Sequence, residues 1–285
     1  MKHIPVLLDA VLGALGDISG KRIVDCTFGA GGYTRAFLER GAIVTAFDRD
    51  SNVLCDVDLI RAEYGDRFNF VPRAFSSISE LDGKYDAIVF DLGISSMQID
   101  NAERGFSFRM DADLDMRMDT KNLIPASELI EQVSVDELAQ ILRNYGDVRN
   151  AMNVARIIKN AAPKTTFQLR DLIRNPKDVA PVFQALRIAV NDEMGEVERA
   201  LSAVPDLLNE SGKCICVTFH SIEDRIVKNT FREWTTAPGD PRMPQVCPAP
   251  FIALKTMLPT DMELANNSRA RSAHMRGVQK VVLEA

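Results

Sequence analysis

The sequence predicts an α/β fold in which a seven-stranded, mainly parallel sheet is interrupted after its fourth strand by an all-helical domain. Four apolar runs come early, and helical segments separate the first three, which is the alternation that builds parallel strands with right-handed crossovers. After residue 98 the pattern becomes loop-like and then helical, and strand-like runs return at residue 213. The 285 residues, 46% of them hydrophobic, suffice for such a domain and a second one inserted into it.

The strands are predicted from short apolar runs bounded by turn residues. The fourth run is apolar almost to its terminal acid, as in a parallel strand that is buried on both faces. Glu210-Ser211-Gly212 is predicted to form a turn before the fifth strand, and helices are expected at Tyr33–Arg40 and Asp224–Phe231. The seven predicted strands are Arg22–Phe28, Ile43–Asp48, Phe68–Pro72, Tyr85–Asp91, Lys213–Phe219, Phe251–Met257 and Val278–Leu283.

Residues 101–208 are predicted to form the inserted domain on the substrate side, and residues 1–100 and 209–285 a discontinuous sheet domain. The insertion begins with a charged loop, residues 99–122, and continues as helices from about Pro125. Two apolar stripes at helical spacing are interpreted as packing surfaces. They are Leu138, Ile141, Leu142 and Tyr145, and then Leu186, Val190, Met194, Val197, Leu201 and Val204.

Composition excludes several classes of function. The net charge of −6 gives no general attraction to nucleic acid, so a polyanion has to meet a local basic patch. The five cysteines form no C-x-x-C pair, and Cys214 and Cys216 are predicted to share one face of a strand, so neither a zinc site nor a disulfide is expected. Without a signal peptide or an apolar run of about 18 residues, a cytoplasmic protein with reduced thiols is expected.

A glycine-rich turn, Asp25 to Gly32, joins the first strand to the first helix, and Asp48 ends the second strand. Glycines let the backbone approach a nucleotide-like ligand, and an acid at the second strand's tip can bind both ribose hydroxyls. The spacing G-A-G-G differs from the G-x-G-x-x-G of dinucleotide sites, and Asp25 is poorly placed for a pyrophosphate. It suits a cationic ligand, such as the ammonium end of S-adenosylmethionine. A tight turn without a ligand is the alternative.

Asp91 ends the fourth strand at the same edge of the sheet as Asp25 and Asp48, where open α/β sheets bind ligands. Two roles remain open for Asp91. It can accept a hydrogen from an exocyclic amine that is being methylated, or it can hold the ammonium group of the cofactor. Phe75 follows the third strand and is a candidate to pack on an adenine ring, with a core phenylalanine as the alternative.

Several long strings in this chain resemble the MraW (RsmH) family, the bacterial 16S ribosomal RNA cytosine-N4 methyltransferases. The resemblance runs nearly from end to end, and the strings are specific to that family. They include His3–Leu8, Asp25–Gly32, Asp48–Asp50, Asp91–Ser96 with Gln98, Glu103–Phe108, Leu114–Asp119, Phe183–Asn191, Phe219–Lys228 and Ser268–Ala273.

The resemblance implies a class I (Rossmann-like) methyltransferase that methylates N4 of one cytidine in the decoding centre of 16S ribosomal RNA, without a metal or a covalent intermediate. It leaves the catalytic proton acceptor unknown. It places S-adenosyl-L-methionine at Gly31, Gly32, Tyr33, Asp48, Phe75, Asp91 and Gln98. Four positions depart from the family pattern: Tyr33-Thr34 for His-Ser, Met97 for proline, Ala112-Asp113 for Gly-Pro, and Asn267-Ser268 for Asn-Pro.

The main partner implied is the small ribosomal subunit, and the target cytosine has to be unstacked to reach the methyl group. The alternatives are an amine methyltransferase acting on another nucleic acid or on protein, and a ribosome assembly factor that has lost turnover. The inserted helices are expected to shape an RNA-binding cleft or, alternatively, to form only a packing or homodimer surface.

Two interpretations remain open for His220, and two for a cluster of basic residues near the C-terminus. His220 either faces the active site or caps the helix that follows it. The basic residues either contact RNA phosphates or form a solvated surface. This basic cluster consists of Arg269, Arg271 and Arg276, with Arg225 and Lys228 as neighbours.

Overall fold

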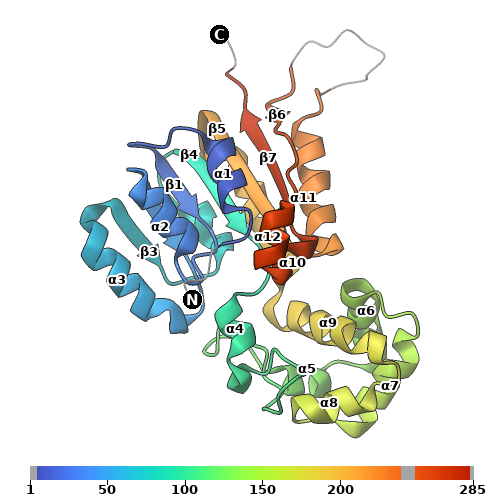
Figure 1. Ribbon diagram of the computed structural model, residues 1–285. Coiled ribbons are helices and arrows are strands. Elements are labelled where there is room, and N and C mark those ends of the chain that lie inside the picture. The colour runs from blue at the N-terminus through green and yellow to red at the C-terminus, as the bar shows by residue number, and fades with distance from the viewer. Residues whose placement is uncertain (1–4, 239–247, 283–285) are drawn as a thin grey trace. The chain divides into compact units, whose positions relative to one another are not determined.

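The computed structural model describes residues 5–238 and 248–282 and divides into two compact units. The first unit comprises Met1–Gly93 and Met194–Ala285, and the second comprises Ile94–Glu193. The first is built on a seven-stranded sheet, whereas the second consists of helices and loops (Figure 1). None of the described helices is long and apolar enough to cross a membrane.

The predicted seven-stranded sheet is confirmed, with the strand order β3-β2-β1-β4-β5-β7-β6. The strands from β3 through β5 run parallel, and β7 is antiparallel to both of its neighbours. Because β1 lies between β2 and β4, the order reverses there, and ligands of open sheets bind beyond the carboxyl ends at such a point. The strands are β1 Arg22–Asp25, β2 Ile43–Phe47, β3 Phe68–Val71, β4 Tyr85–Asp91, β5 Leu208–Thr218, β6 Phe251–Ala253 and β7 His274–Lys280.

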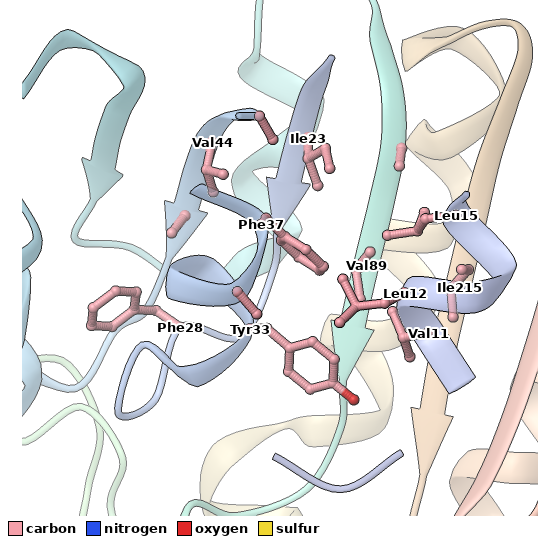
Figure 2. Packing of buried hydrophobic residues seen from close by; sticks show 14 of the residues in the cluster. Val11, Leu12, Leu15, Ile23, Phe28, Tyr33, Phe37, Val44, Val89 and Ile215 are labelled. Carbon is pink, nitrogen blue, oxygen red and sulfur yellow. The ribbon is translucent and has the colours of Figure 1, made fainter. Parts of the chain in front are cut away.

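Successive residues of the central strands enter two hydrophobic clusters, one on each face of the sheet. Ile23 and Val89 pack in the cluster that also contains residues of the first three helices (Figure 2), whereas Val24 and Phe90 pack in the other. The apolar runs are therefore continuous because both faces are covered. The helices are α1 Leu8–Leu15, α2 Gly32–Glu39 and α3 Leu54–Tyr64 for the first cluster, and α10 Glu193–Leu207 and α11 Ser221–Trp234 for the second.

Most of the predicted strands had at least one wrong limit. β5 starts at Leu208, because the expected turn at Glu210-Ser211-Gly212 is a bulge within the strand, with Ser211 at a φ of 61°. β7 starts at His274, which pairs with Thr218, instead of at Val278. β6 ends at Ala253, and β1, β2 and β3 also end slightly earlier than predicted.

The prediction that Cys214 and Cys216 share one face of a strand is confirmed. Cys214 and Cys216 lie in the same hydrophobic cluster, on one face of β5, and both are free and buried. Cys26 is also free and buried, and Cys55 is free and exposed. Cys247 lies outside the described residues.

The second unit has its own core, which the stripes of its helices fill. Leu138 and Leu142 of the first predicted stripe are fully buried there, whereas Ile141 and Tyr145 are only partly buried. Ser134 and Thr165 begin two of the helices with reciprocal capping boxes. The helices are α4 Ser96–Asp100, α5 Ala126–Gln132, α6 Val135–Gly146, α7 Ala151–Ala161, α8 Thr166–Leu172 and α9 Val179–Asn191.

The predicted boundaries of the inserted domain need correction, because α10 belongs with the sheet. Val197, Leu201 and Val204 pack in the same cluster as the central strands, whereas Leu186 and Val190 pack in the core of the second unit. Asp192, with a φ of 48°, ends α9 between them. One helical stripe in the sequence therefore serves two cores, and the units divide at 93/94 and 193/194 instead of at 100/101 and 208/209.

Polar side chains fix the loop of residues 99–122 within the second unit. Asn191 is fully buried, and its amide accepts a hydrogen bond from Met118 N and donates one to Met116 O, both at 2.7 Å. Thr166 N donates to Ala112 O, so a backbone hydrogen bond holds the segment Ala112-Asp113, where the sequence departs from the family pattern.

The remaining described helix is α12, Asp261–Asn266, in the first unit.

Candidate functional site

The carboxyl ends of β1, β2, β4 and β5 bring most of the candidate residues to one edge of the first unit's sheet. Asp25 ends β1, Asp91 ends β4, and Asp48 directly follows β2. A threonine in the glycine-rich turn links two of these ends, because Thr27 Oγ1 accepts a hydrogen bond from Asp91 N at 2.7 Å. Asp91 is paired with Val217, so the ends of β4 and β5 are also neighbours.

The Asp25 carboxylate anchors the start of α2. Oδ1 accepts from Thr27 N at 3.1 Å, Oδ2 accepts from Thr34 Oγ1 at 2.6 Å, and the Thr34 backbone N–H also donates to this carboxylate. The bond from Thr34 N satisfies a donor at a helix N-terminus, where backbone N–H groups lack intrahelical partners. Asp25 is 1% exposed, and this burial raises its pKa. Its two oxygens accept three hydrogen bonds within the fold, which favours a structural role over the predicted ammonium contact.

The two glycines at the start of α2, Gly31 and Gly32, are required by packing of the chain on itself. Gly31 has a φ of 72°, and a Cβ there would lie 2.6 Å from Ile60 Cδ1. A Cβ on Gly32 would lie 2.4 Å from Pro5 Cγ. Tyr33 is 3% exposed and lies in the first hydrophobic cluster (Figure 2), where its hydroxyl donates to the Val6 carbonyl. The cofactor contacts predicted for these three residues stay predictions.

Asp48 connects the end of β2 to the glycine-rich turn. Oδ2 accepts from Gly29 N at 2.9 Å, and Oδ1 accepts from Asp50 N at 2.8 Å. Burial is the largest influence and raises the pKa of Asp48 to about 6, against the opposing effect of the two backbone hydrogen bonds. An ionised carboxylate accepts about four hydrogen bonds, so Asp48 retains capacity for the two ribose hydroxyls that the sequence predicts.

Asp91 differs from the other two acids because its Oδ1 atom is buried and has no hydrogen-bond partner among the described residues. Burial, followed by the charges of Asp25 and Glu223, raises the pKa of Asp91 well above its usual value. An unsatisfied buried acceptor costs about 1–3 kcal/mol, and few remain in native proteins. A cationic N–H donor would satisfy this oxygen and offset the three negative charges, so the site fits the ammonium group of S-adenosylmethionine.

Phe75 begins the short 3-10 helix Phe75–Glu80 and packs edge-on against Phe90, with ring centroids 5.8 Å apart. Ser76 N, the next amide, donates to Glu196 Oε2 at 3.2 Å, which fixes this turn against α10. Phe75 is therefore partly buried against the edge of the core, as its alternative interpretation expects in part. Because the ring is only half-buried, an adenine contact on its other side stays a prediction.

Gln98 lies in the second unit, within α4, and its side chain caps its own helix. Ser95 N donates to Gln98 Oε1 at 3.1 Å, and Gln98 N donates to Ser95 Oγ at 3.3 Å. The family has proline at the position of Met97, and proline is tolerated in the first turn of a helix. In this chain the capping box orders the turn without that proline. The contact between Gln98 and the cofactor stays a prediction.

His220 caps α11, which confirms one of its two interpretations. Glu223 N donates to His220 Nδ1 at 3.4 Å, and Glu223 Oε2 accepts from His220 N at 3.3 Å and Phe219 N at 2.8 Å. Glu223 is 1% exposed and was missed as a functional candidate in the sequence. The spacing of a cap residue and a glutamate three positions later, His220 to Glu223, is the signal that identifies it.

One residue of the basic cluster, Arg276, forms an ion pair within the fold. Arg276 on β7 makes a bidentate ion pair with Asp224 on α11, at 2.7 and 2.9 Å, and this pair lowers the pKa of Asp224. That pairing replaces the phosphate contact favoured for Arg276. Arg225, Lys228 and Arg271 are exposed, and the side chain of Arg269 lies outside the described structure.

Comparisons with known proteins identify a family and several relatives. A model of the MraW methylase family matches residues 1–281. The "Ribosomal RNA small subunit methyltransferase H" of Rickettsia canadensis (strain McKiel) is 41% identical, covering 98% of both chains. That of Wolbachia sp. subsp. Drosophila simulans (strain wRi) is 40% identical and covers 99% of this chain and 100% of the relative. Among solved structures, an rRNA methylase from Streptococcus thermophilus is 12% identical, with a TM-score of 0.44 over 99% of each chain.

Proposed function

The chain belongs to the MraW methylase family, and we propose that it transfers a methyl group from S-adenosylmethionine to N4 of a specific cytidine in the 16S RNA of the small ribosomal subunit. Relatives that match almost the whole chain at about 40% identity are named as small-subunit ribosomal RNA methyltransferases. The observation in the structure that supports the proposal most directly is the buried Oδ1 atom of Asp91 at the switch point of the sheet, which has no hydrogen-bond partner within residues 5–238 and 248–282.

We assign the ammonium end of the cofactor to Asp91 and the ribose to Asp48. Asp91 offers an acceptor that no residue in the described part of the chain uses, whereas the oxygens of Asp25 accept hydrogen bonds from Thr27 and Thr34. Asp48 follows the second strand and holds the glycine-rich turn through Gly29. This division gives each acid a separate proposed task and favours cofactor binding among the two roles left open for Asp91.

S-adenosylmethionine supplies a methyl group that is already activated by the positive sulfonium. The protein therefore has to orient the cytosine amine, whose lone pair is delocalised into the ring, and exclude water from the transfer. Asp25 and Thr34 hold the start of α2, and Thr27 holds the end of β4 to that of β1, so the sheet edge is rigid before any ligand binds. Such pre-organisation lowers the entropic cost of alignment.

The proposal is tested with small ribosomal subunits from cells that lack their own N4 methyltransferase. Purified protein and radiolabelled S-adenosylmethionine are added, the RNA is digested, and the labelled nucleoside is identified by mass spectrometry. Label on N4 of cytidine is the expected result. Naked 16S RNA and duplex DNA serve as parallel substrates.

Each alternative gives a different outcome in the same assay. Transfer to duplex DNA or to protein, but not to the subunit, would contradict the ribosomal substrate and support another amine methyltransferase. Binding of the cofactor without transfer to any substrate would support an assembly factor that has lost turnover. Label on a different nucleoside would contradict the assignment of the N4 amine.

A further inference from the structure

Two buried side-chain polar atoms lack a hydrogen-bond partner among the described residues, and both belong to neighbouring strand ends. One is Oδ1 of Asp91, which ends β4, and the other is Nε2 of His220, which follows the end of β5. Native proteins satisfy nearly all such atoms, so an exception marks a place where a ligand or water completes the hydrogen bonding. The assignment of Asp91 to the cofactor leaves the missing hydrogen bond of His220 Nε2 to be explained, since Glu223 Oε1, which lies 2.9 Å away, forms no hydrogen bond with it.

The contacts of His220 determine which of its ring nitrogens carries a hydrogen. Nδ1 accepts from Glu223 N at 3.4 Å and is therefore unprotonated. A neutral ring then carries its hydrogen on Nε2, so this atom is a donor. Oε1 of Glu223 lies 2.9 Å from Nε2, and its negative charge favours the same tautomer, although the contact lacks the direction of a hydrogen bond.

The Glu223 carboxylate lies against the imidazole of His220 and holds it in position. Its Oε2 atom accepts hydrogen bonds from Phe219 N and His220 N, which ties the carboxylate to the backbone just past β5. Gly93, two residues beyond Asp91, passes beside this pair, because a Cβ there would lie 3.7 Å from Glu223 Oε1. The donor on His220 therefore belongs to the same sheet edge as the acceptor on Asp91, and Glu223 acts as its positioning residue.

We propose that the Nε2–H of His220 donates a hydrogen bond to N3 of the target cytosine. This inference rests on the proposed function. Enzymes that modify a flipped-out base read it through hydrogen bonds to its Watson–Crick edge. Cytosine offers an acceptor at N3, whereas uracil carries an N–H there, so a donor at this position selects for cytosine. Because N3 is bonded to the carbon that bears N4, the same bond also sets the direction of the reacting amine.

Two substitutions separate this role from helix capping. Asparagine in His220→Asn keeps an acceptor at the position of Nδ1 and is a favourable N-cap residue, but it removes the donor at the position of Nε2. Glutamine in His220→Gln places an amide N–H near the position of Nε2 but loses the short capping geometry. The three proteins are compared for kcat/KM on small subunits, affinity for S-adenosylmethionine by calorimetry, and thermal unfolding.

If the proposal is correct, His220→Asn lowers kcat/KM on subunits by about 10- to 100-fold while cofactor affinity and the unfolding temperature stay close to wild type. His220→Gln retains more of the activity than His220→Asn, in spite of a lower unfolding temperature. The reverse order, with His220→Asn fully active and His220→Gln impaired, overturns the proposal and leaves capping as the role of His220. Full activity of both variants also overturns it and assigns Nε2 to an ordered water.

The wild-type protein distinguishes a failure of this inference from a failure of the proposed function. If the wild type transfers no label to cytidine N4, the function itself is wrong. If the wild type transfers label and His220→Asn transfers it equally well, only the role of His220 is wrong. Should His220→Asn fail to fold, His220→Gln decides the question, since an active but less stable protein supports the donor and an inactive folded one contradicts it.

Discussion

The two halves of the sheet's carboxyl edge differ in how their polar side chains are satisfied. At β1 and β2, Asp25 and Asp48 accept hydrogen bonds from Thr27, Thr34, Gly29 and Asp50 within the fold. At β4 and β5, Asp91 Oδ1 and His220 Nε2 are buried and form no hydrogen bond among the described residues. In the first half the acids hold the turn and the strand ends through internal hydrogen bonds, whereas in the second half the hydrogen bonding is completed by what binds there.

The two halves should therefore contribute differently to the free energy of folding and to the free energy of ligand binding. Carboxylates that accept several internal hydrogen bonds stabilise the folded chain, and their loss leaves buried donors without partners. A buried acceptor without a partner destabilises the folded chain until a ligand satisfies it. Substitutions in the first half should therefore affect folding, whereas those in the second half should affect binding more than folding.

The largest expected effect on folding is that of Asp25→Ala. It leaves the Thr34 hydroxyl and two backbone N–H groups without their acceptor in a buried site, so the free energy of unfolding should fall by about 3 kcal/mol. Urea unfolding measures the change. Asp17→Ala is the control, because Asp17 also accepts a backbone N–H two residues later but is exposed, and it should change stability by about 0.5 kcal/mol. Equal effects of the two variants would contradict the comparison.

Asp91→Asn should separate binding from folding most clearly. The amide retains the size of the carboxylate but loses its charge, so the affinity for S-adenosylmethionine should fall by about 2–3 kcal/mol, or roughly 30- to 150-fold. Because the wild-type carboxylate is buried beside two other acids, the variant should be as stable as the wild type or more stable. Calorimetric titration and thermal unfolding of one sample measure both. An unstable variant with normal cofactor affinity would assign Asp91 to the scaffold.

Asp48 is expected to affect both folding, like Asp25, and cofactor binding, like Asp91. Its effect on folding should depend on pH. Its pKa of about 6 in the folded protein is above the ordinary value near 4, so the folded state binds more protons between about pH 4 and 6. Its contribution to stability is therefore present at low pH and is lost as the pH rises through 6. Asp48→Asn should gain about 2 kcal/mol relative to wild type between pH 4 and pH 7 in unfolding experiments. A pH-independent difference would show that the carboxyl is not buried as described.

The same variant tests the assignment of Asp48 to the ribose. Loss of its charge should weaken binding of S-adenosylmethionine by about 1–3 kcal/mol at pH 7. The wild-type affinity should increase from pH 5 to pH 7, because only the ionised carboxylate accepts both hydroxyl hydrogen bonds. Titration calorimetry at the two pH values provides the measurement, and an affinity that Asp48→Asn leaves unchanged would remove Asp48 from the cofactor site.

The smallest effect is expected for Arg276→Gln, which tests the region beyond β5. The partly exposed pair with Asp224 should contribute about 1 kcal/mol to the stability of the fold. Because this pair already uses the guanidinium, KM for small subunits should stay within about twofold of wild type, whereas a lost phosphate contact would weaken binding and flatten its salt dependence. Arg225→Gln is the matched control at an exposed position of the same basic cluster.

The sequence by itself determined the order of the strands along the chain and the edge at which their acids meet. The apolar runs at β1, β2 and β4 end in or just before Asp25, Asp48 and Asp91, because a buried parallel strand has to be apolar on both faces until it reaches the polar edge. The glycines at the start of α2 and the family strings also follow from local patterns. These features depend on neighbouring residues along the chain, so the sequence alone predicts them.

Tertiary structure decided which of those residues remain available for a ligand. Nothing in the sequence says that Thr34 and Thr27 engage both oxygens of Asp25. Nor does it say that Asp91 Oδ1 finds no hydrogen-bond partner in the described structure, because these facts depend on which strand ends are neighbours. The break of one apolar stripe at Asp192 into helices that serve two cores was likewise invisible, since the helical period continues across it. Periodicity shows which face of a helix is buried, but only the packed chain shows what covers it.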